Sequence, residues 1–297
     1  MGPFGHVVTA MVTPFDASGA VDYARAAQLA RRLIEAGNDG LVVAGTTGES
    51  PTLSDAEKIR LFHTVKEAVG DRARVIAGTG TYDTAHSIHL SQEAARAGCD
   101  GLLLVNPYYN RPSQEGLYAH FRAIAESTPL PVMLYNIPGR TAVNCTPDTI
   151  ARLAEVPNIV AVKEAAGSLD QVSEIRIKTP ERFAIYSGDD SLTLPKLAVG
   201  AVGVVSVAGH LVAAEIQQMI RAYFAGQVAE ALRLHRRLFP LFKVLFITTN
   251  PVPVKAALRL VGFDCGKPRL PLVDVTPKEE EQIRTVLRSL DLVPTPV

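Results

Sequence analysis

RVIAGTGTYDTAHSIHLSQEAARAGCDGLLLV, residues 74–105, holds one complete strand–helix–strand unit. Its two apolar runs, Arg74–Ala77 and Gly101–Val105, are nearly continuous rather than alternating, which is typical of parallel strands covered on both faces. Between them, Thr84–Ala97 is amphipathic, with Asp83 at the N-cap position and a glycine just past its end. The stretch therefore predicts two parallel strands joined by a helix.

The same alternation recurs along most of the chain. Six further runs have the composition of buried strands: Val7–Val12, Leu41–Ala44, Pro131–Tyr135, Ile159–Lys163, Arg182–Tyr186 and Val202–Val207. Three further amphipathic segments of helix length are Tyr23–Ala36, Asp55–Val69 and Glu115–Ser127. Eight such strands predict an α/β fold, the closed (β/α)8 TIM barrel, because an open doubly wound sheet more often has five or six strands and a glycine-rich phosphate loop.

The pattern changes after about residue 225. Three helices are expected there with no strands between them: Val228–Lys243, Val254–Leu260 and Pro277–Leu290. The prolines of Asn250-Pro251-Val252-Pro253 separate the first two, because proline removes a backbone donor and restricts the residue before it. We therefore expect residues 1–225 to form the barrel that carries the active site and residues 226–297 to form a small C-terminal helical domain.

Charge and composition exclude several classes of partner. The 297 residues include 30 basic and 30 acidic side chains, so no basic field favours nucleic acid and no polybasic segment favours a membrane. The longest uncharged run, Leu197–Ala214, is interrupted by glycines and is interpreted as a buried strand entering a helix. The N-terminus lacks the pattern of a signal peptide, and three cysteines without a CxxC motif favour a reducing, cytoplasmic compartment.

Lys163 is the most informative candidate, because active sites of such barrels lie at the carboxyl ends of the strands and Lys163 ends the run Ile159–Val162. An ammonium group in a dry barrel mouth is poorly solvated, so its pKa should fall from about 10.4 towards neutrality. A neutral amine can attack a ketone and form a Schiff base. The residues alone leave a second interpretation open, in which Lys163 pairs with Glu164 at a solvated strand end.

Other strand ends carry weaker signals. The turn Gly45-Thr46-Thr47-Gly48 offers hydroxyls and backbone donors that can hold a small carboxylate, although most such turns are only turns. Tyr109 and Tyr135 can pass protons, and Arg140 can clamp a second carboxylate, although each type of residue more often packs or faces solvent.

No cofactor or metal is expected. The sequence has no GxGxxG motif or P-loop, so a nucleotide cofactor is not supported. His86 and His89 have helical spacing, but no third ligand lies nearby in the sequence, and a half-exposed helix explains them better than a metal site.

Taken together, the chain resembles the dihydrodipicolinate synthase family, within the superfamily of pyruvate-dependent Schiff-base lyases. The motifs that carry the resemblance run over nearly the whole chain. They are Thr13-Pro14-Phe15, Gly45-Thr46-Thr47-Gly48-Glu49-Ser50, Pro107-Tyr108-Tyr109-Asn110, Tyr135-Asn136-Ile137-Pro138-Gly139-Arg140-Thr141, Val162-Lys163-Glu164-Ala165, Ser187-Gly188-Asp189-Asp190 and Asn250-Pro251-Val252-Pro253-Val254-Lys255.

The resemblance implies a reaction and its substrate contacts. Lys163 is implied as the Schiff-base lysine for pyruvate, and Thr47 and the backbone of Val205 as further pyruvate contacts. Arg140 is implied as the residue that holds the carboxylate of L-aspartate 4-semialdehyde. The implied reaction is the condensation of these two substrates to 4-hydroxy-tetrahydrodipicolinate, on the pathway to diaminopimelate and lysine.

The resemblance also implies a proton relay and an assembly. Thr46, Tyr135 and Tyr109 match the relay of the family, with Tyr109 reaching in from a neighbouring subunit. The implied assembly is a homotetramer, a dimer of dimers, and the implied chemistry needs neither metal nor nucleotide.

Two alternatives remain at this point. One is another pyruvate-dependent aldolase, such as N-acetylneuraminate lyase or a 2-keto-3-deoxy sugar acid aldolase. Neuraminate lyases typically have serine where Thr46 stands, lack an arginine at Arg140 and carry Gly-Tyr-Asp-Glu near residues 187–190. The other is a non-catalytic barrel that binds a metabolite, which would be expected to lose Lys163 or Tyr135.

Feedback-inhibited members of the family bind lysine between two subunits. The matching positions here are Ser50, Pro51, Asp55, Lys58, Tyr82, His86 and Tyr108. Strongly inhibited members typically have histidine at the positions of Asp55 and Lys58, asparagine at that of Tyr82 and glutamate at that of His86. The resemblance therefore predicts weak inhibition by L-lysine or none.

Overall fold

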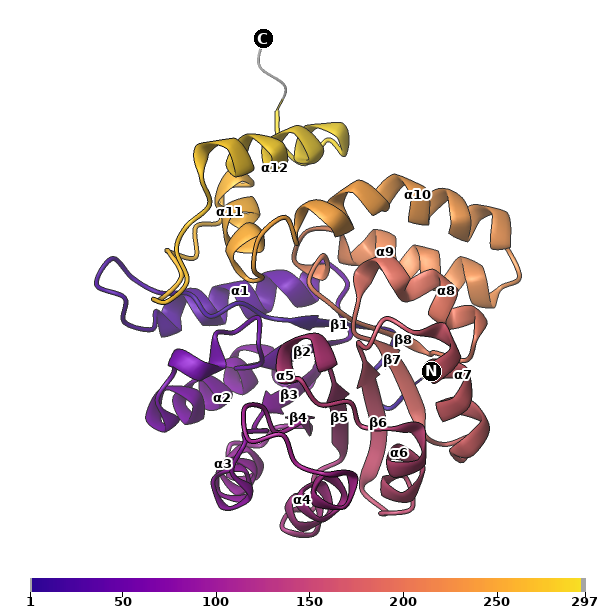
Figure 1. The fold of residues 1–297 in the computed structure, drawn as a ribbon. Coiled ribbons are helices and arrows are strands. Elements are labelled where there is room, and N and C mark those ends of the chain that lie inside the picture. The colour runs from indigo at the N-terminus through magenta and orange to yellow at the C-terminus, as the bar shows by residue number, and fades with distance from the viewer. Residues whose placement is uncertain (1, 295–297) are drawn as a thin grey trace.

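A closed parallel barrel forms the centre of the protein in the computed structural model, which describes residues 2–294 (Figure 1). Each strand pairs with its neighbours in sequence, and β1 also pairs with β8. The strands are β1 (Val7–Ala10), β2 (Gly40–Val43), β3 (Arg74–Gly78), β4 (Gly101–Val105), β5 (Val132–Asn136), β6 (Ile159–Glu164), β7 (Ala184–Ser187) and β8 (Gly203–Ser206). All eight predicted strands are confirmed, with ends that differ by no more than two residues.

Helices surround the barrel. They are α1 (Tyr23–Glu35), α2 (Asp55–Val69), α3 (Thr84–Arg96), α4 (Gln114–Glu126), α5 (Pro138–Thr141), α6 (Pro147–Leu153), α7 (Leu169–Lys178), α8 (Thr193–Ala198) and α9 (Gly209–Phe224). The side chains of Asp22, Ser54 and Asp83 cap α1, α2 and α3. Each of these side chains accepts a hydrogen bond from a backbone N–H group of the first turn that has no partner within the helix, and so defines where the helix begins.

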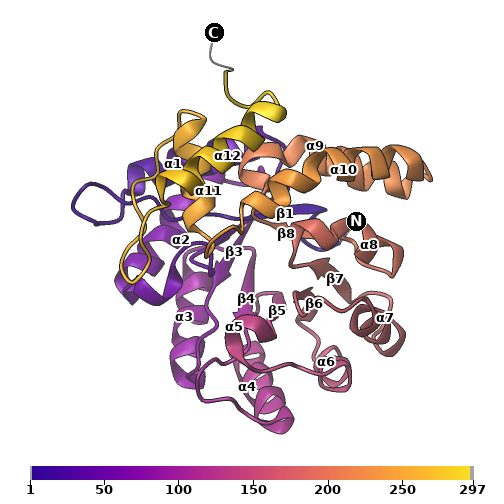
Figure 2. The same cartoon turned by 45° about the horizontal axis from the view of Figure 1, so that its top comes forward.

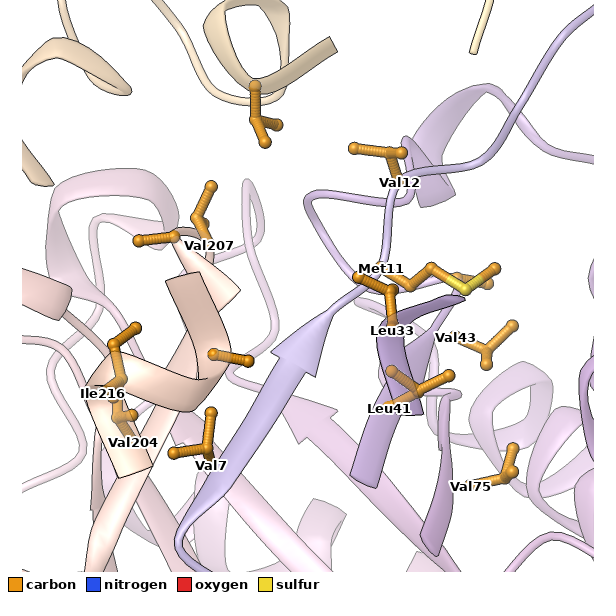
Figure 3. Close-up of a cluster of buried hydrophobic side chains, with 14 of the residues drawn as sticks. Val7, Met11, Val12, Leu33, Leu41, Val43, Val75, Val204, Val207 and Ile216 are labelled. Atoms are coloured by element: carbon orange, nitrogen blue, oxygen red, sulfur yellow. The ribbon is translucent and has the colours of Figure 1, made fainter. Parts of the chain in front are cut away.

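The strands bury both faces, as their continuous apolar runs predict. One set of side chains fills the barrel interior, among them Val42, Ile76, Met133 and Ala161. The other set packs against the helices, and Figure 3 shows Val7, Leu41, Val75 and Val204 in that layer, together with Leu33 of α1 and Ile216 of α9. The barrel is therefore a packed core that leaves room only at its mouth.

Three helices follow the barrel: α10 (Val228–Val244), α11 (Val252–Leu260) and α12 (Pro277–Ser289). α10 packs along α9, and α11 packs against α12 and α9, so the C-terminal region lies on one side of the barrel (Figures 1 and 2). The helical C-terminal region is confirmed. The division into two domains at residue 225 stays a prediction.

The uncharged run Leu197–Ala214 forms the end of α8, the strand β8 and the beginning of α9. The prediction of a buried strand that enters a helix is confirmed. Between residues 2 and 294, none of the helices has the length and apolar character needed to cross a membrane.

Candidate active site

The loop after β2 is held in a strained conformation at the carboxyl end of the barrel. It contains Thr46 and Thr47, and the non-glycine residues Ala44 and Glu49 flank it in the left-handed region, with φ of 54° and 58°. Such conformations persist only where the surroundings enforce them, and they cluster at functional sites. Thr47 is buried, whereas Thr46 is partly exposed to a cavity.

A cavity of about 210 Å³ opens beside this loop. Six predicted site residues line it: Thr46, Tyr135, Arg140, Ser50, Pro51 and Tyr108. Gly78 and Gly80 line it as well, and a Cβ on Gly80 would collide with the backbone nitrogen of Val105. The absence of side chains at these glycines therefore lets neighbouring strand ends approach closely beside the cavity.

Lys163 lies buried at the mouth of the barrel, on the same face of β6 as the interior residue Ala161. Its Nζ lies 4.0 Å from the centroid of the Tyr135 ring. Burial is the main cause that lowers the pKa of Lys163 to about 7. The positive charges of Arg140 and Lys196 also lower this pKa, whereas the negative charge of Asp190 raises it. At neutral pH about half of an amine with this pKa is unprotonated and available as a nucleophile.

The alternative pairing of Lys163 with Glu164 is wrong, because successive side chains of a strand point to opposite faces. The carboxylate of Glu164 instead accepts hydrogen bonds from Asn136 at 2.9 Å, Gln171 at 3.2 Å and the backbone nitrogen of Ala166 at 2.6 Å. Glu164 therefore belongs to a polar network outside the barrel interior and does not neutralise Lys163.

Tyr135 supplies a protonated phenol beside the amine. Burial raises its pKa to about 12, although the charge of Arg140 and a hydrogen bond with the Thr46 side chain oppose this shift. At neutral pH the phenol keeps its proton and can both donate and accept a hydrogen bond. The structure thus brings Lys163, Tyr135 and Thr46 together in the order that a local proton relay needs.

Asp190 is a functional candidate that was not predicted from the sequence, although it lies in one of the family motifs. It is 2% exposed and accepts hydrogen bonds from Ser206 and from the backbone nitrogens of Val207 at 3.0 Å and Ala208 at 2.9 Å. It thereby holds the end of β8, next to the predicted pyruvate contact Val205, which is buried in the barrel interior. Two adjacent acids after a predicted strand are the signal that could have pointed to it.

The C-terminal region also reaches the site. Asn250 donates from Nδ2 to Thr47 Oγ1 at 2.9 Å, and its backbone oxygen lies 3.4 Å from Nη2 of Arg140. Nζ of Lys255, in α11, lies 2.6 Å from Oε1 of Glu49, and both side chains are buried. In the sequence this segment indicates a helix break and a family motif, and no local pattern in it predicts the contacts with the loop after β2.

Tyr109 lies apart from the other relay candidates. Its side chain is 95% exposed, its φ is +71°, and it does not line the cavity. The neighbouring Tyr108 does line the cavity and packs edge-on against Tyr82, with ring centroids 5.2 Å apart. Within a single chain, Tyr109 is therefore not placed with Tyr135, and its predicted role requires a second subunit.

The predicted lysine positions are partly occupied by contacts of their own. Both carboxylate oxygens of Asp55 lie 2.9 Å from Nε2 of His86. Lys58 is 5% exposed, and burial lowers its pKa while the charge of Asp55 raises it. The Asp55 carboxylate, which could have replaced a lost ligand group for lysine, is thus already engaged.

Within residues 2–294 no cluster of three or more histidine, cysteine or acidic side chains could hold a metal ion. His86 contacts Asp55 across the gap between α2 and α3, and His89 is exposed.

The sequence profile of the dihydrodipicolinate synthetase family matches residues 3–290. The chain belongs to the dihydrodipicolinate synthetase family. The family prediction is thereby confirmed over nearly the whole chain, together with the Schiff-base lyase class that goes with it. The roles of the individual site residues stay predictions.

Relatives in this family match end to end. The 4-hydroxy-tetrahydrodipicolinate synthase of Cyanothece sp. is 62% identical, over 99% of this chain and 100% of its own length. The crystal structure of the dihydrodipicolinate synthase (DHDPS) from Cyanidioschyzon merolae with lysine bound is 51% identical, with a TM-score of 0.97 over 99% of this chain and 100% of that one. The Bacillus anthracis enzyme DapA-2 is 50% identical, with a TM-score of 0.95 over the same shares.

Proposed function

We propose that this protein condenses pyruvate with L-aspartate 4-semialdehyde to 4-hydroxy-tetrahydrodipicolinate through a Schiff base on Lys163. The observation that carries the proposal is the buried amine of Lys163, with a pKa of about 7, beside the protonated phenol of Tyr135. The synthase name of the Cyanothece relative supports this reaction over that of a neuraminate lyase or sugar acid aldolase. A non-catalytic barrel would have no need of a nucleophile kept neutral at a cost in solvation.

The first half of the reaction uses the neutral amine. Nζ of Lys163 attacks the keto carbon of pyruvate, water leaves, and a protonated imine forms. The imine draws electrons, so a methyl proton of pyruvate can leave to give an enamine. Tyr135 lies beside Lys163 and hydrogen-bonds with the Thr46 side chain, and both can pass these protons, since a neutral phenol and a hydroxyl each donate and accept.

The second half forms the ring. The enamine carbon attacks the aldehyde carbon of the second substrate, whose oxygen takes up a proton. The amino group of the adduct then attacks the imine carbon, closes the ring and releases Lys163. Arg140 lines the cavity and offers a guanidinium group to the carboxylate of the semialdehyde.

The contacts with pyruvate are assigned to the loop after β2 and to β8. Thr47 and the backbone of Val205 are the proposed contacts of the keto acid. Both are buried, Thr47 in the loop after β2 and Val205 in β8. Tyr109 of a neighbouring subunit is proposed to complete the relay, within a homotetramer. The nearly full exposure of its ring on a single chain supports this assignment.

The proposed setting is the cytoplasm, and three free, buried cysteines fit a reducing compartment. The proposed two-domain division places the catalytic groups on residues 1–225 and the supporting contacts of Asn250 and Lys255 on residues 226–297.

Borohydride reduction in the presence of pyruvate tests the proposal. Mass analysis of the digested protein should find a reduced pyruvate adduct on Lys163. An assay with both the semialdehyde and sugar acid substrates should show turnover of the semialdehyde. Turnover of a sugar acid alone would favour the aldolase alternative, and the lack of any adduct would favour a binding protein.

A further inference from the structure

Asn250 contacts Thr47, which we assign to pyruvate, and Arg140, which we assign to the carboxylate of the semialdehyde. The side chain of Asn250 is 5% exposed, and its Nδ2 donates to Oγ1 of Thr47 at 2.9 Å. Its backbone oxygen lies 3.4 Å from Nη2 of Arg140. Asn250 lies in the segment between α10 and α11, two helices that Figure 1 shows beside the barrel. These contacts therefore join the C-terminal region to the mouth of the barrel.

The direction of the hydrogen bond determines what Thr47 can do. A hydroxyl group has one proton and two lone pairs, whereas an amide N–H can only donate. When Nδ2 of Asn250 donates to Thr47 Oγ1, the hydroxyl acts as acceptor in that bond, and its own proton is left for another acceptor. A carboxylate is a strong acceptor of this kind.

The C-terminal region that carries Asn250 also holds the loop after β2. Lys255, in α11, forms a buried ion pair with Glu49, which follows the turn that contains Thr47. The backbone nitrogen of Arg269 donates to the other carboxylate oxygen of Glu49 at 2.9 Å. The loop after β2 therefore contacts the C-terminal region at both Thr47 and Glu49. These contacts hold the Asn250 amide within hydrogen-bonding distance of the Thr47 hydroxyl.

Within residues 2–294, no donor reaches Oδ1 of the buried Asn250 side chain. Its contact with Thr47 is therefore the side-chain hydrogen bond that orients the amide. We propose that Asn250 is a positioning residue, which directs the hydroxyl proton of Thr47 towards the carboxylate of pyruvate. This inference rests on the proposed function, because that function assigns Thr47 to pyruvate.

Asn250→Asp and Asn250→Ala test the inference through the concentration of pyruvate that half-saturates borohydride trapping. In Asn250→Asp the amide donor becomes an acceptor that takes the Thr47 proton and repels the substrate carboxylate. The half-saturating concentration should rise about tenfold or more, and further than in Asn250→Ala. The KM for the semialdehyde should change little, since the backbone oxygen that faces Arg140 remains.

A double-mutant cycle separates this role from a merely structural one. In a Thr47→Val background, Asn250→Ala should cause no further loss of pyruvate affinity, whereas in Thr47→Ser its effect should persist. Asn158→Ala serves as the matched control, because Asn158 hydrogen-bonds to backbone carbonyls at the opposite end of the barrel. Circular dichroism checks that each variant is folded.

Two kinds of result are distinguishable. If the wild-type protein traps no pyruvate, the proposed function fails and the inference fails with it. If the wild-type protein traps pyruvate and Asn250→Asp has the same half-saturating concentration, the inference alone is overturned. Losses that add independently in the double-mutant cycle, or that raise both substrate constants equally, would assign Asn250 a structural role instead.

Discussion

Lys163 and Tyr135 are direct partners across the strands β6 and β5, and Nζ of Lys163 lies 4.0 Å from the centroid of the tyrosine ring. The pairing sets a buried amine with a pKa of about 7 beside a phenol with a pKa of about 12. At neutral pH the amine can act as nucleophile while the phenol still carries a proton. Parallel strand register, rather than a flexible loop, fixes this relation.

Lys163→Ala should abolish borohydride trapping of pyruvate and nearly all turnover while the protein stays folded, because the nucleophile is lost. Lys178→Ala, which changes an exposed lysine, should trap pyruvate normally. Mass analysis of the reduced protein makes the comparison. An adduct on another lysine, for instance Lys255, would show that the nucleophile is wrongly assigned.

In the wild-type protein, the rate of Schiff-base formation should rise with pH through about 7 and then level off, because only the neutral amine attacks. The unfolded chain binds a proton at Lys163 up to about pH 10.4, and the folded chain does not above about 7. The contribution of Lys163 to the free energy of unfolding should therefore rise with pH between those values. Trapping rates between pH 5 and 10 check the first statement.

Arg140→Ala should raise the KM for the semialdehyde about ten- to a hundredfold, the value of a lost charge-assisted hydrogen bond. Schiff-base formation with pyruvate should continue. Because the charge of Arg140 lowers the pKa of Lys163, the inflection of the trapping rate should move to higher pH, and in Arg140→Lys it should move less.

Asp190→Asn provides the control of opposite sign, since Asp190 raises the pKa of Lys163 and its loss should move the inflection to lower pH. Equal damage to both substrates in Arg140→Ala, with no movement of the inflection, would argue for a structural role of Arg140.

Tyr109→Phe protein mixed with Lys163→Ala protein should recover activity once subunits exchange. One site of each mixed pair then has both the wild-type lysine and the wild-type tyrosine. The prediction follows from the family resemblance, and the nearly full exposure of the Tyr109 ring on a single chain supports it. Specific activity is measured against time of mixing, with exchange followed by native mass spectrometry. Full exchange without recovery would place Tyr109 in its own subunit's site.

L-Lysine should inhibit weakly or not at all. The Asp55 carboxylate is engaged by His86, and Lys58 presents a buried cationic side chain at the position matching the lysine site. Initial rates at sub-saturating pyruvate are measured against L-lysine concentration, with D-lysine as the control. Half-inhibition below the millimolar range would contradict this interpretation, and would place the protein with relatives that bind lysine.

Lys255→Met should lower the free energy of unfolding by about 3–5 kcal/mol, because it leaves Glu49 buried without its ion-pair partner. Adding Glu49→Gln should restore part of the loss. Arg122→Ala, which breaks an exposed pair with Glu126, should cost no more than about 1 kcal/mol. Denaturant titrations compare the variants. Equal losses of unfolding free energy in Lys255→Met and Arg122→Ala would mean that the buried Lys255–Glu49 pair stabilises the protein no more than an exposed pair does.

The strands and most helix ends could be predicted from the sequence because their signals are local. Continuous apolar runs, the caps Asp22, Ser54 and Asp83, and the spacing of the segments carry the information needed for a barrel. Lys163 could be predicted as well, since a lysine at the end of a buried parallel strand must lie at the barrel mouth. Its low pKa follows from that position.

Only the tertiary structure decided which polar groups pair with one another. No local pattern shows that Asn250 donates to Thr47, 203 positions earlier in the chain, or that Lys255 pairs with Glu49. The choice between Lys163 facing Glu164 and Lys163 facing Tyr135 depended on strand pleat and cross-strand register. These relations arise from packing of distant segments against one another, and hydrogen-bond geometry and burial are properties of that packing rather than of any short stretch of sequence.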